Sequence, residues 1–298
     1  MDKVRQILFV PPAPIVWAEH LGAFRENGIE LETTQTLSSD QIGQGLADGT
    51  WDVGIAVMDN VIAWNAERSA GLQIITQLER STIMRFCGVP EYGTLADAAA
   101  GTIAVDSTTN GFVLVLYRAL ARAGIDWRTC RYDTVGGVRH RFEAMAAGKA
   151  AASILIPPFD AMAREKGFKI LWDGKDIAPA YPGVVVAARA AWLAERPNVA
   201  VRYLGALLRA NEWAARPENA AAARAALVAA RYPGPAAERL VREIVPGLVP
   251  SLDGWAEVVA LRRECGLLPT PEPSAAVINT TLLDRARAPG SGWRDLVK

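Results

Sequence analysis

The sequence predicts an α/β protein made of two lobes. Its 298 residues are enough for two domains that each bury a core of their own. The first part of the chain alternates short apolar strands with helices, an order that favours a mainly parallel sheet with helices on its faces. The same order starts again near Thr94. Two α/β units of similar size are therefore expected.

The first predicted unit runs strand, helix, strand, helix, strand. The first strand is a short apolar run, whereas the second alternates apolar with polar residues as a half-buried strand does. Ser38 and Ser39 supply the side chains that begin the second helix, which ends at Gly49. The strands are expected at residues 4–10, 29–34 and 51–57, and the helices at 15–24 and 38–48.

The second predicted unit repeats this order, and a helical segment follows it. Its strands are expected at residues 102–105, 131–135 and 151–156, with a helix of regular apolar spacing at 112–123. Beyond Trp192 the pattern is helical throughout, with prolines at helix starts and breaks. These helices cannot build a third sheet. We expect a helical C-terminal extension that packs on one of the lobes.

Composition excludes several classes of function. The 32 basic residues balance the 32 acidic ones, so no net charge attracts nucleic acid. No stretch approaches the roughly 20 apolar residues that span a bilayer, which argues against membrane insertion. Residues 1–10 lack the long apolar segment of a secretory signal. The sequence as given predicts a cytoplasmic protein, or a periplasmic one whose leader was removed.

Cysteine and histidine usage argues against disulfides, metals and cofactors. Cys87, Cys130 and Cys265 are odd in number and widely separated, which suits neither a disulfide framework nor a zinc site. Neither His20 nor His140 stands near a second His or Cys in the sequence. We expect buried free thiols, no metal and no cofactor.

Candidate binding residues lie in the loops that follow predicted strands, because ligands of open parallel sheets bind at the carboxyl ends of the strands. Hydroxyl side chains at helix starts can bind a carboxylate or sulfonate together with free backbone N–H groups: Ser38, Ser39, Ser107, Thr108 and Thr109. Plain helix capping needs the same residue types, so both interpretations stay open. Five further residues in these loops are also candidates: Pro12, Asp59, Asn60, Asn110 and Gly137.

Cationic and aromatic side chains supply further candidates. The run Arg139-His140-Arg141 opens a helix after Gly137, and one guanidinium turned into a cleft would clamp a carboxylate. We expect Arg139 to take this role, although surface arginines are commonly solvated. An aromatic ligand would stack on one or more of three rings that otherwise lie in the core or at the rim: Trp17, Phe159 and Tyr181.

Several strings of the sequence carry a family resemblance. They are Leu21-Gly22-Ala23-Phe24, Gly28-Ile29-Glu30-Leu31, Gly45-Leu46-Ala47-Asp48-Gly49 with Asp52-Val53-Gly54-Ile55, Gly101-Thr102-Ile103-Ala104-Val105 and Phe142-Glu143-Ala144-Met145-Ala146-Ala147-Gly148. Over roughly residues 4 to 215 the chain resembles the solute-binding family of alkanesulfonate, taurine and NMT1/THI5-like proteins.

The resemblance implies a type II periplasmic-binding-protein fold, whose two lobes close on a ligand by a hinge motion. It implies two chain crossings, near 85–90 and 184–189. Residues 1–88 with 187–298 would form the first lobe, and 89–186 the second. The implied ligand is a small polar or anionic organic molecule, of an aromatic, sulfonate, carboxylate or pyrimidine-like kind. An ABC permease would be the partner if the chain is exported.

An enzyme on the same fold is the alternative, since relatives include a desulfinase, a decarboxylase and a pyrimidine synthase. The sequence holds no G-x-S-x-G, Walker, H-E-x-x-H or dinucleotide motif. The loop at residues 10–14 also lacks the cysteine that the desulfinase carries there. A decarboxylase or lyase would therefore depend on Asp59, Asp106 or His140 as acid or base. A ligand sensor for a partner protein is a third possibility.

Overall fold

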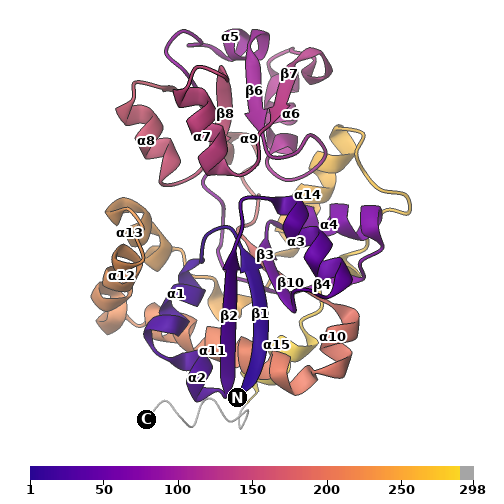
Figure 1. Ribbon diagram of the computed structural model, residues 1–298, viewed down its shortest axis with the longest axis vertical. Coiled ribbons are helices and arrows are strands. Elements are labelled where there is room, and N and C mark those ends of the chain that lie inside the picture. Colours follow the sequence, from indigo (N-terminus) through magenta and orange to yellow (C-terminus); the bar gives the residue numbers. More distant parts are fainter. Residues whose placement is uncertain (289–298) are drawn as a thin grey trace.

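The computed structural model describes residues 1–288 and shows two α/β lobes, one above the other in Figure 1. Each lobe is built on a five-stranded sheet. The strand order is β2-β1-β3-β10-β4 in the first lobe and β7-β6-β8-β5-β9 in the second. Helices cover the faces of both sheets (Figure 1). The predicted fold class is therefore confirmed.

The first sheet combines parallel strands with one antiparallel strand that arrives late in the chain. β1, β2 and β3 run parallel, as the alternation of strands and helices predicts. β10 is antiparallel to both of its neighbours, β3 and β4. The strands are β1 (Asp2–Leu8), β2 (Ile29–Gln35), β3 (Val53–Ala56), β4 (Leu72–Gln77) and β10 (Val185–Arg189).

The second sheet follows the same plan. β6 pairs in parallel with β7 and β8, and β5 runs antiparallel between β8 and β9. The strands are β5 (Arg85–Gly88), β6 (Thr102–Val105), β7 (Arg131–Thr134), β8 (Ala152–Leu155) and β9 (Lys169–Asp173). Each sheet thus contains one strand from a segment that was expected at a crossing.

The chain passes between the sheets earlier than the expected positions. Because β5 belongs to the second sheet and β10 to the first, the crossings are residues 78–84 and 178–184. The boundary expected after residue 88 therefore assigns β5 to the wrong lobe, and the boundary expected after residue 186 cuts through β10. The physical reason is that a short apolar strand has the same pattern in either sheet, so the sequence does not indicate where it pairs. The two crossings touch through a bridge between Ser81 and Pro182.

Helices lie at each of the predicted positions, although the segment predicted as one helix at 15–24 forms two, and further helices lie between them. The first lobe and the C-terminal extension contain α1 (Ala13–His20), α2 (Ala23–Glu26), α3 (Ser39–Asp48), α4 (Met58–Arg68), α10 (Ala190–Glu195), α11 (Pro197–Ala215), α12 (Ala220–Ala229), α13 (Gly234–Arg242), α14 (Leu252–Glu264) and α15 (Thr281–Arg287). The second lobe contains α5 (Leu95–Ala100), α6 (Val113–Arg122), α7 (Val138–Ala146), α8 (Phe159–Glu165) and α9 (Gly174–Ile177). None of the helices within residues 1–288 is long and apolar enough to cross a membrane.

Most of the C-terminal extension packs on the first lobe, as expected. α11 lies against the first sheet, where the buried Tyr203 hydroxyl donates a hydrogen bond to Gln6 on β1. The Tyr203 ring stacks on Phe24 at 5.5 Å. On α1, the buried Trp17 indole donates to the carbonyl of Ala223 in α12. These contacts join residues about 200 positions apart into one core.

α14 departs from that expectation because it bridges the two lobes (Figure 1). It packs on α4 of the first lobe and on α6 of the second. Arg262 of α14 forms an ion pair with Asp59 of α4, and both side chains are almost completely buried. Arg118 of α6 pairs with Glu257 and Glu264 of α14. The apolar side chains around α14 form one core that extends into both lobes.

Candidate functional site

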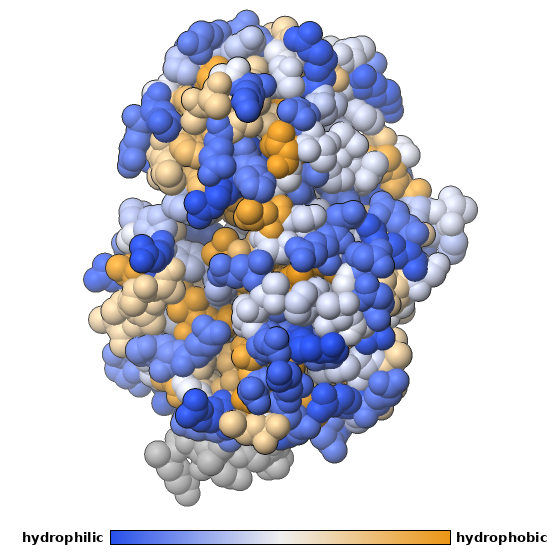
Figure 2. All heavy atoms as spheres, in the orientation of Figure 1, coloured by the Kyte–Doolittle hydropathy of each residue, from blue (hydrophilic) through white to orange (hydrophobic). Residues whose placement is uncertain are grey.

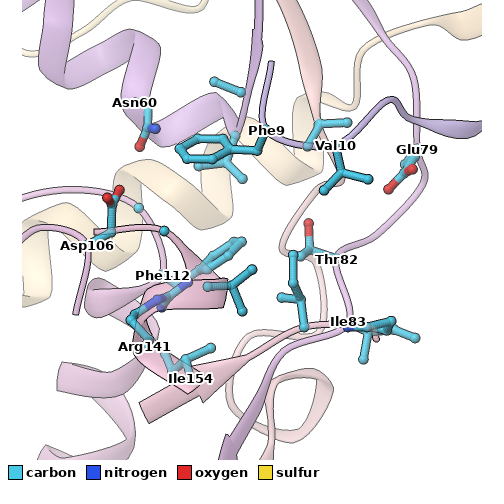
Figure 3. Close-up of a pocket in the computed structure, with 18 of the residues that line it drawn as sticks. Phe9, Val10, Asn60, Glu79, Thr82, Ile83, Asp106, Phe112, Arg141 and Ile154 are labelled. Carbon is cyan, nitrogen blue, oxygen red and sulfur yellow. The ribbon is translucent and has the colours of Figure 1, made fainter. Parts of the chain in front are cut away.

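A cavity lies between the lobes, where the carboxyl ends of strands from both sheets meet (Figure 3). Segments after β1 and β3 line it from the first lobe, and segments after β6 and β8 line it from the second. Its volume is about 180 Å³. An apolar cavity of about 150 Å³ is large enough to hold benzene. The space therefore suits a molecule with a body about the size of one ring.

The middle of the cavity is apolar. Phe9 and Val10 enter it from the end of β1, Phe112 from the start of α6, and Ile154 from β8 (Figure 3). On the molecular surface, Figure 2 shows apolar side chains along the boundary between the lobes. Val10 belongs to the exposed apolar side chains and also lines the cavity. Burial of these surfaces against a ligand would favour binding, at about 25 cal/mol per Å² of apolar area.

Arg141 is the main charged group of the second lobe in this cavity. It stands in the first turns of α7, and its side chain is directed toward the apolar centre (Figure 3). Only 5% of the residue is exposed, and its Nε has no hydrogen-bond partner among the described residues. Burial lowers the pKa of Arg141 to about 10, and the nearby Asp106 carboxylate partly opposes that shift. At neutral pH the guanidinium is charged and lacks a carboxylate within ion-pair distance in residues 1–288.

Asn60 adds a second unsatisfied polar group. It lies in the first turn of α4, is 5% exposed and lines the cavity. Its Oδ1 has no hydrogen-bond partner among the described residues. Figure 3 places Asn60 and Asp106 on the same side of the cavity. Buried polar groups are nearly always hydrogen-bonded, so the unsatisfied atoms of Arg141 and Asn60 are exceptions. A ligand in the cavity could supply their missing hydrogen bonds.

The opposite side of the cavity is formed by the first crossing and the C-terminal extension. Glu79 and Thr82 come from the crossing, and Arg239 comes from α13. Burial raises the pKa of Glu79, and the Arg239 guanidinium partly opposes this shift. Figure 3 shows the Glu79 carboxylate at the cavity wall, on the side away from Arg141.

A second, shallower crevice opens beside the cavity at the start of α3. Four predicted residues border it: Ser38, Ser39, Thr108 and His140. The backbone N–H of Gly137 donates a hydrogen bond of 2.9 Å to the carbonyl of Leu37, which joins the lobes there. A Cβ atom at position 137 would stand 3.0 Å from this carbonyl oxygen, which accounts for glycine at this close approach.

The structure brings six predicted site residues to the cavity itself. They are Pro12, Asn60, Asp106, Ser107, Asn110 and Gly137. Ser107 is also a loop-stabilising residue, because its hydroxyl accepts a hydrogen bond from the N–H of Thr109. Asp106, Ser107 and Asn110 border the shallower crevice as well. The ligand-binding role of these residues stays a prediction.

Asp59 lies elsewhere than expected. Arg262 donates to both of its carboxylate oxygens, at 2.6 and 3.0 Å, and the N–H of Gly111 donates to one of them. The side chain is 0% exposed and does not line the cavity. The carboxylate is therefore occupied in holding α4, α14 and the loop before α6 together.

Five further predicted residues lie outside the cavity lining. Arg139 lies over the Phe159 ring at 5.6 Å, and Phe159 packs on Phe142. The Tyr181 ring lies 6.2 Å from that of Phe112, behind the cavity wall. The remaining two have structural contacts: Trp17 is in the core, and the Thr109 carbonyl accepts from Arg262.

Several apolar and charged residues that line the cavity were not predicted from the sequence. The missed residues include Phe9, Val10, Glu79, Phe112 and Arg239. Arg141 was part of the run Arg139-His140-Arg141, and a helical projection that places it with the buried Phe142 and Met145 is the signal that would have separated it from Arg139. No comparable signal marks Glu79, because its position depends on the crossing.

Two of the three cysteines are buried as expected, whereas Cys130 is half-buried. Cys87 is buried, and desolvation raises the pKa of its thiol to about 12. Desolvation likewise raises the pKa of Cys265 to about 11. Residues 1–288 contain no group of three or more His, Cys, Asp or Glu side chains placed to hold a metal ion. The cavity has an apolar centre and polar groups at its sides.

Comparison with known proteins agrees with this architecture. Residues 91–229 match the model of the NMT1-like family. The alkanesulfonate-binding protein SsuA from Xanthomonas axonopodis pv. citri, bound to MOPS, has 18% sequence identity and a TM-score of 0.73, over 94% of this chain and 98% of its own. No curated protein matches the chain.

Two other solved structures are similar over nearly their whole length. A Candida albicans protein with the generic periplasmic binding protein fold has 13% identity and a TM-score of 0.74, over 96% of this chain and 95% of its own. The desulfurization enzyme DSZB, in complex with biphenyl-2-sulfinic acid, has 16% identity and a TM-score of 0.67, over 96% of this chain and 99% of its own. Identities of this size show the fold alone. Residues 91–229 therefore carry the sequence pattern of the NMT1-like family, and the chain as a whole has the periplasmic-binding-protein fold.

Proposed function

We propose that this protein binds a small organic anion with an apolar body in the cavity between its lobes, as solute-binding proteins do. The observation that carries the proposal is Arg141, a buried guanidinium that has no ion-pair partner within residues 1–288 and lies beside an apolar cavity. An unpaired buried charge costs several kcal/mol. An anionic ligand would offset that cost, and its apolar body would fill the space between Phe9, Val10 and Phe112.

The geometry favours a carboxylate, sulfonate or sulfinate as the anionic group. The planar guanidinium of Arg141 suits oxyanions that accept two hydrogen bonds. MOPS in the Xanthomonas protein and biphenyl-2-sulfinic acid in DSZB are both oxyanions of sulfur. The apolar centre of the cavity would favour ligands whose body is aromatic or a short aliphatic chain.

Lobe closure is the mode of binding that we propose. The hydrogen bond from Gly137 to Leu37 joins the lobes beside the cavity. Its loss would let the lobes separate about the two crossings, which is the hinge motion known from binding proteins of two lobes. If the chain is exported, delivery of the ligand to an ABC permease would follow.

The test is ligand binding to an Arg141→Met variant. Aromatic carboxylates, sulfonates and sulfinates should raise the melting temperature of the unaltered protein, and calorimetry should give a dissociation constant. A charge-assisted hydrogen bond contributes about 1.5–3 kcal/mol, so the variant should bind at least ten-fold more weakly. Arg139→Met is the matched control, because that arginine lies on the same helix but outside the cavity lining. Equal affinity in the Arg141 variant, or no binding of any of these anions, would contradict the proposal.

Mass spectrometry of the ligand after incubation separates binding from catalysis. A binding protein returns its ligand unchanged, whereas a decarboxylase or lyase consumes it. Of the three acid–base candidates, Asp59 is occupied by Arg262, His140 borders the shallower crevice, and Asp106 lines the cavity. The proposed solute-binding role predicts that the ligand is recovered intact. Product formation that grows with time and protein concentration would favour an enzyme instead.

A further inference from the structure

The cavity has two polar sides of different character, separated by its apolar centre. Arg141 supplies a positive charge on one side, and Glu79 supplies a carboxylate on the other (Figure 3). Phe9, Val10 and Phe112 lie between them in this view. A ligand that reaches from one side to the other would carry its two ends into environments of opposite charge.

Glu79 is half-buried and only partly satisfied. The backbone N–H of Ala13, at the start of α1, lies near its carboxylate and acts to lower its pKa. The guanidinium of Arg239 is near, but it pairs with Glu243 at 2.6 Å and not with Glu79. The Tyr232 hydroxyl, which also lies close by, donates to the carbonyl of Pro11. The Glu79 carboxylate therefore retains capacity to accept further hydrogen bonds.

The charges around Glu79 do not cancel. Glu79 and Glu243 face the single guanidinium of Arg239, so this side of the cavity has one carboxylate in excess when both acids are ionised. Burial raises the pKa of Glu79 because the ionised carboxylate is poorly solvated there. A cationic group from a ligand would stabilise the ionised form and supply the missing donors.

We infer that Glu79 is a specificity-determining residue that selects anions carrying an ammonium, or another strong hydrogen-bond donor, at the end opposite the anionic group. This inference rests on the proposed function, because Arg141 must hold the anionic end. The preferred ligand class is then a zwitterion with an apolar spacer, such as an amino acid whose two charges are separated by a ring or by several methylene groups.

The experiment compares matched probes with and without a terminal amine. One pair is para-methylbenzoate and para-(aminomethyl)benzoate; the others are unbranched carboxylates of increasing length, each with and without a terminal amine. Calorimetry on the full chain should show that, at the length that fits, the amine tightens binding by about ten-fold or more, since hydrogen bonds to charged groups contribute about 1.5–3 kcal/mol.

Two variants locate the effect. In Glu79→Gln the ratio of the two affinities within each matched pair should shrink to within about two-fold, whatever the common change in affinity for both members. Glu238→Gln is the matched control, because Glu238 is an exposed residue on α13 that pairs with Arg242 and does not line the cavity. It should leave the advantage unchanged. Circular dichroism verifies that each variant is folded.

The outcomes separate this inference from the proposed function. If simple carboxylates bind but the amine gives no advantage at any length in the unaltered protein, the role of Glu79 is overturned and the anion site remains. That comparison holds even if Glu79→Gln does not fold. If an amine advantage persists in Glu79→Gln, another group recognises the amine and the inference is likewise overturned. If no member of any pair binds, the anion site fails and this inference fails with it.

Discussion

The buried ion pair between Asp59 and Arg262 holds three parts of the chain together. Its two side chains come from α4 and α14, and the N–H of Gly111 before α6 completes the coordination of the carboxylate. Removing one partner of such a pair leaves an uncompensated charge in the interior. The pair therefore matters for stability mainly because the loss of either partner would leave the other charge buried and unpaired.

We predict that Asp59→Asn lowers the free energy of unfolding by about 3–5 kcal/mol. Urea denaturation followed by circular dichroism measures this change in the free energy of unfolding. The double variant Asp59→Asn with Arg262→Met should recover part of the loss, since no lone charge remains buried. Asp133→Asn, an exposed position on β7, is the control and should change stability by less than about 0.5 kcal/mol. A loss below about 1 kcal/mol for Asp59→Asn would contradict this account.

At the scale of single residues, the sequence predicts residue types better than residue roles. It marks Asp59 as unusually polar after a strand, but its partner Arg262 is 203 positions away, and no local pattern connects them. It marks the run of arginines at the start of α7, but the choice between Arg139 and Arg141 depends on which face of the helix is buried. Both roles are set by packing between distant segments.

Among the elements, the start of α7 forms the contact that joins the lobes beside the cavity. Gly136 has a φ of 92°, a conformation that glycine adopts readily, and Gly137 donates to Leu37. The pair thus lets the backbone of the second lobe approach the backbone of the first. Any side chain at position 137 would push Leu37 away.

We predict that Gly137→Ala weakens ligand binding without unfolding the protein. The added Cβ would stand 3.0 Å from the Leu37 carbonyl oxygen, so the hydrogen bond between the lobes would lengthen. The loss of about 1 kcal/mol corresponds to roughly five-fold in affinity. Calorimetry with the best-binding carboxylate measures it.

Gly234→Ala is the control for this prediction. A Cβ at Gly234 would meet no atom within 4 Å, and the residue does not line the cavity. Its affinity should equal that of the unaltered protein. If Gly137→Ala binds as tightly as this control, the contact with Leu37 does not contribute to the bound state.

The order of elements is the part of the fold that the sequence predicts well. The parallel strands β1, β2, β3 and β6 and their helices follow the predicted pattern, because alternating strand and helix periodicities are local. For the antiparallel strands β5 and β10, the sequence does not indicate which of the two sheets each strand joins. Their pairing brings together segments far apart in the chain, and hydrophobic periodicity carries no information about such pairing.

For the whole molecule, the shared core predicts cooperative unfolding. Apolar side chains from α4, α6 and α14 form one cluster that reaches into both lobes. Opening that cluster would expose apolar surface of both lobes together, so neither lobe is expected to unfold alone. Urea transitions followed by tryptophan fluorescence and by circular dichroism should coincide. Two separated transitions would show that the lobes are independent in stability.

The position of α14 also bears on how fast a ligand is exchanged. Separation of the lobes along α14 would break either its buried Arg262–Asp59 pair with α4 or the ion pairs of Arg118 on α6 with Glu257 and Glu264. Separation at the start of α7 breaks one backbone hydrogen bond that water can replace. We therefore expect the activation barrier for separating the lobes to be lower at Leu37 and Gly137 than along α14. The ligand would enter and leave at that edge. Substitutions there would therefore change the dissociation rate more than substitutions in α14.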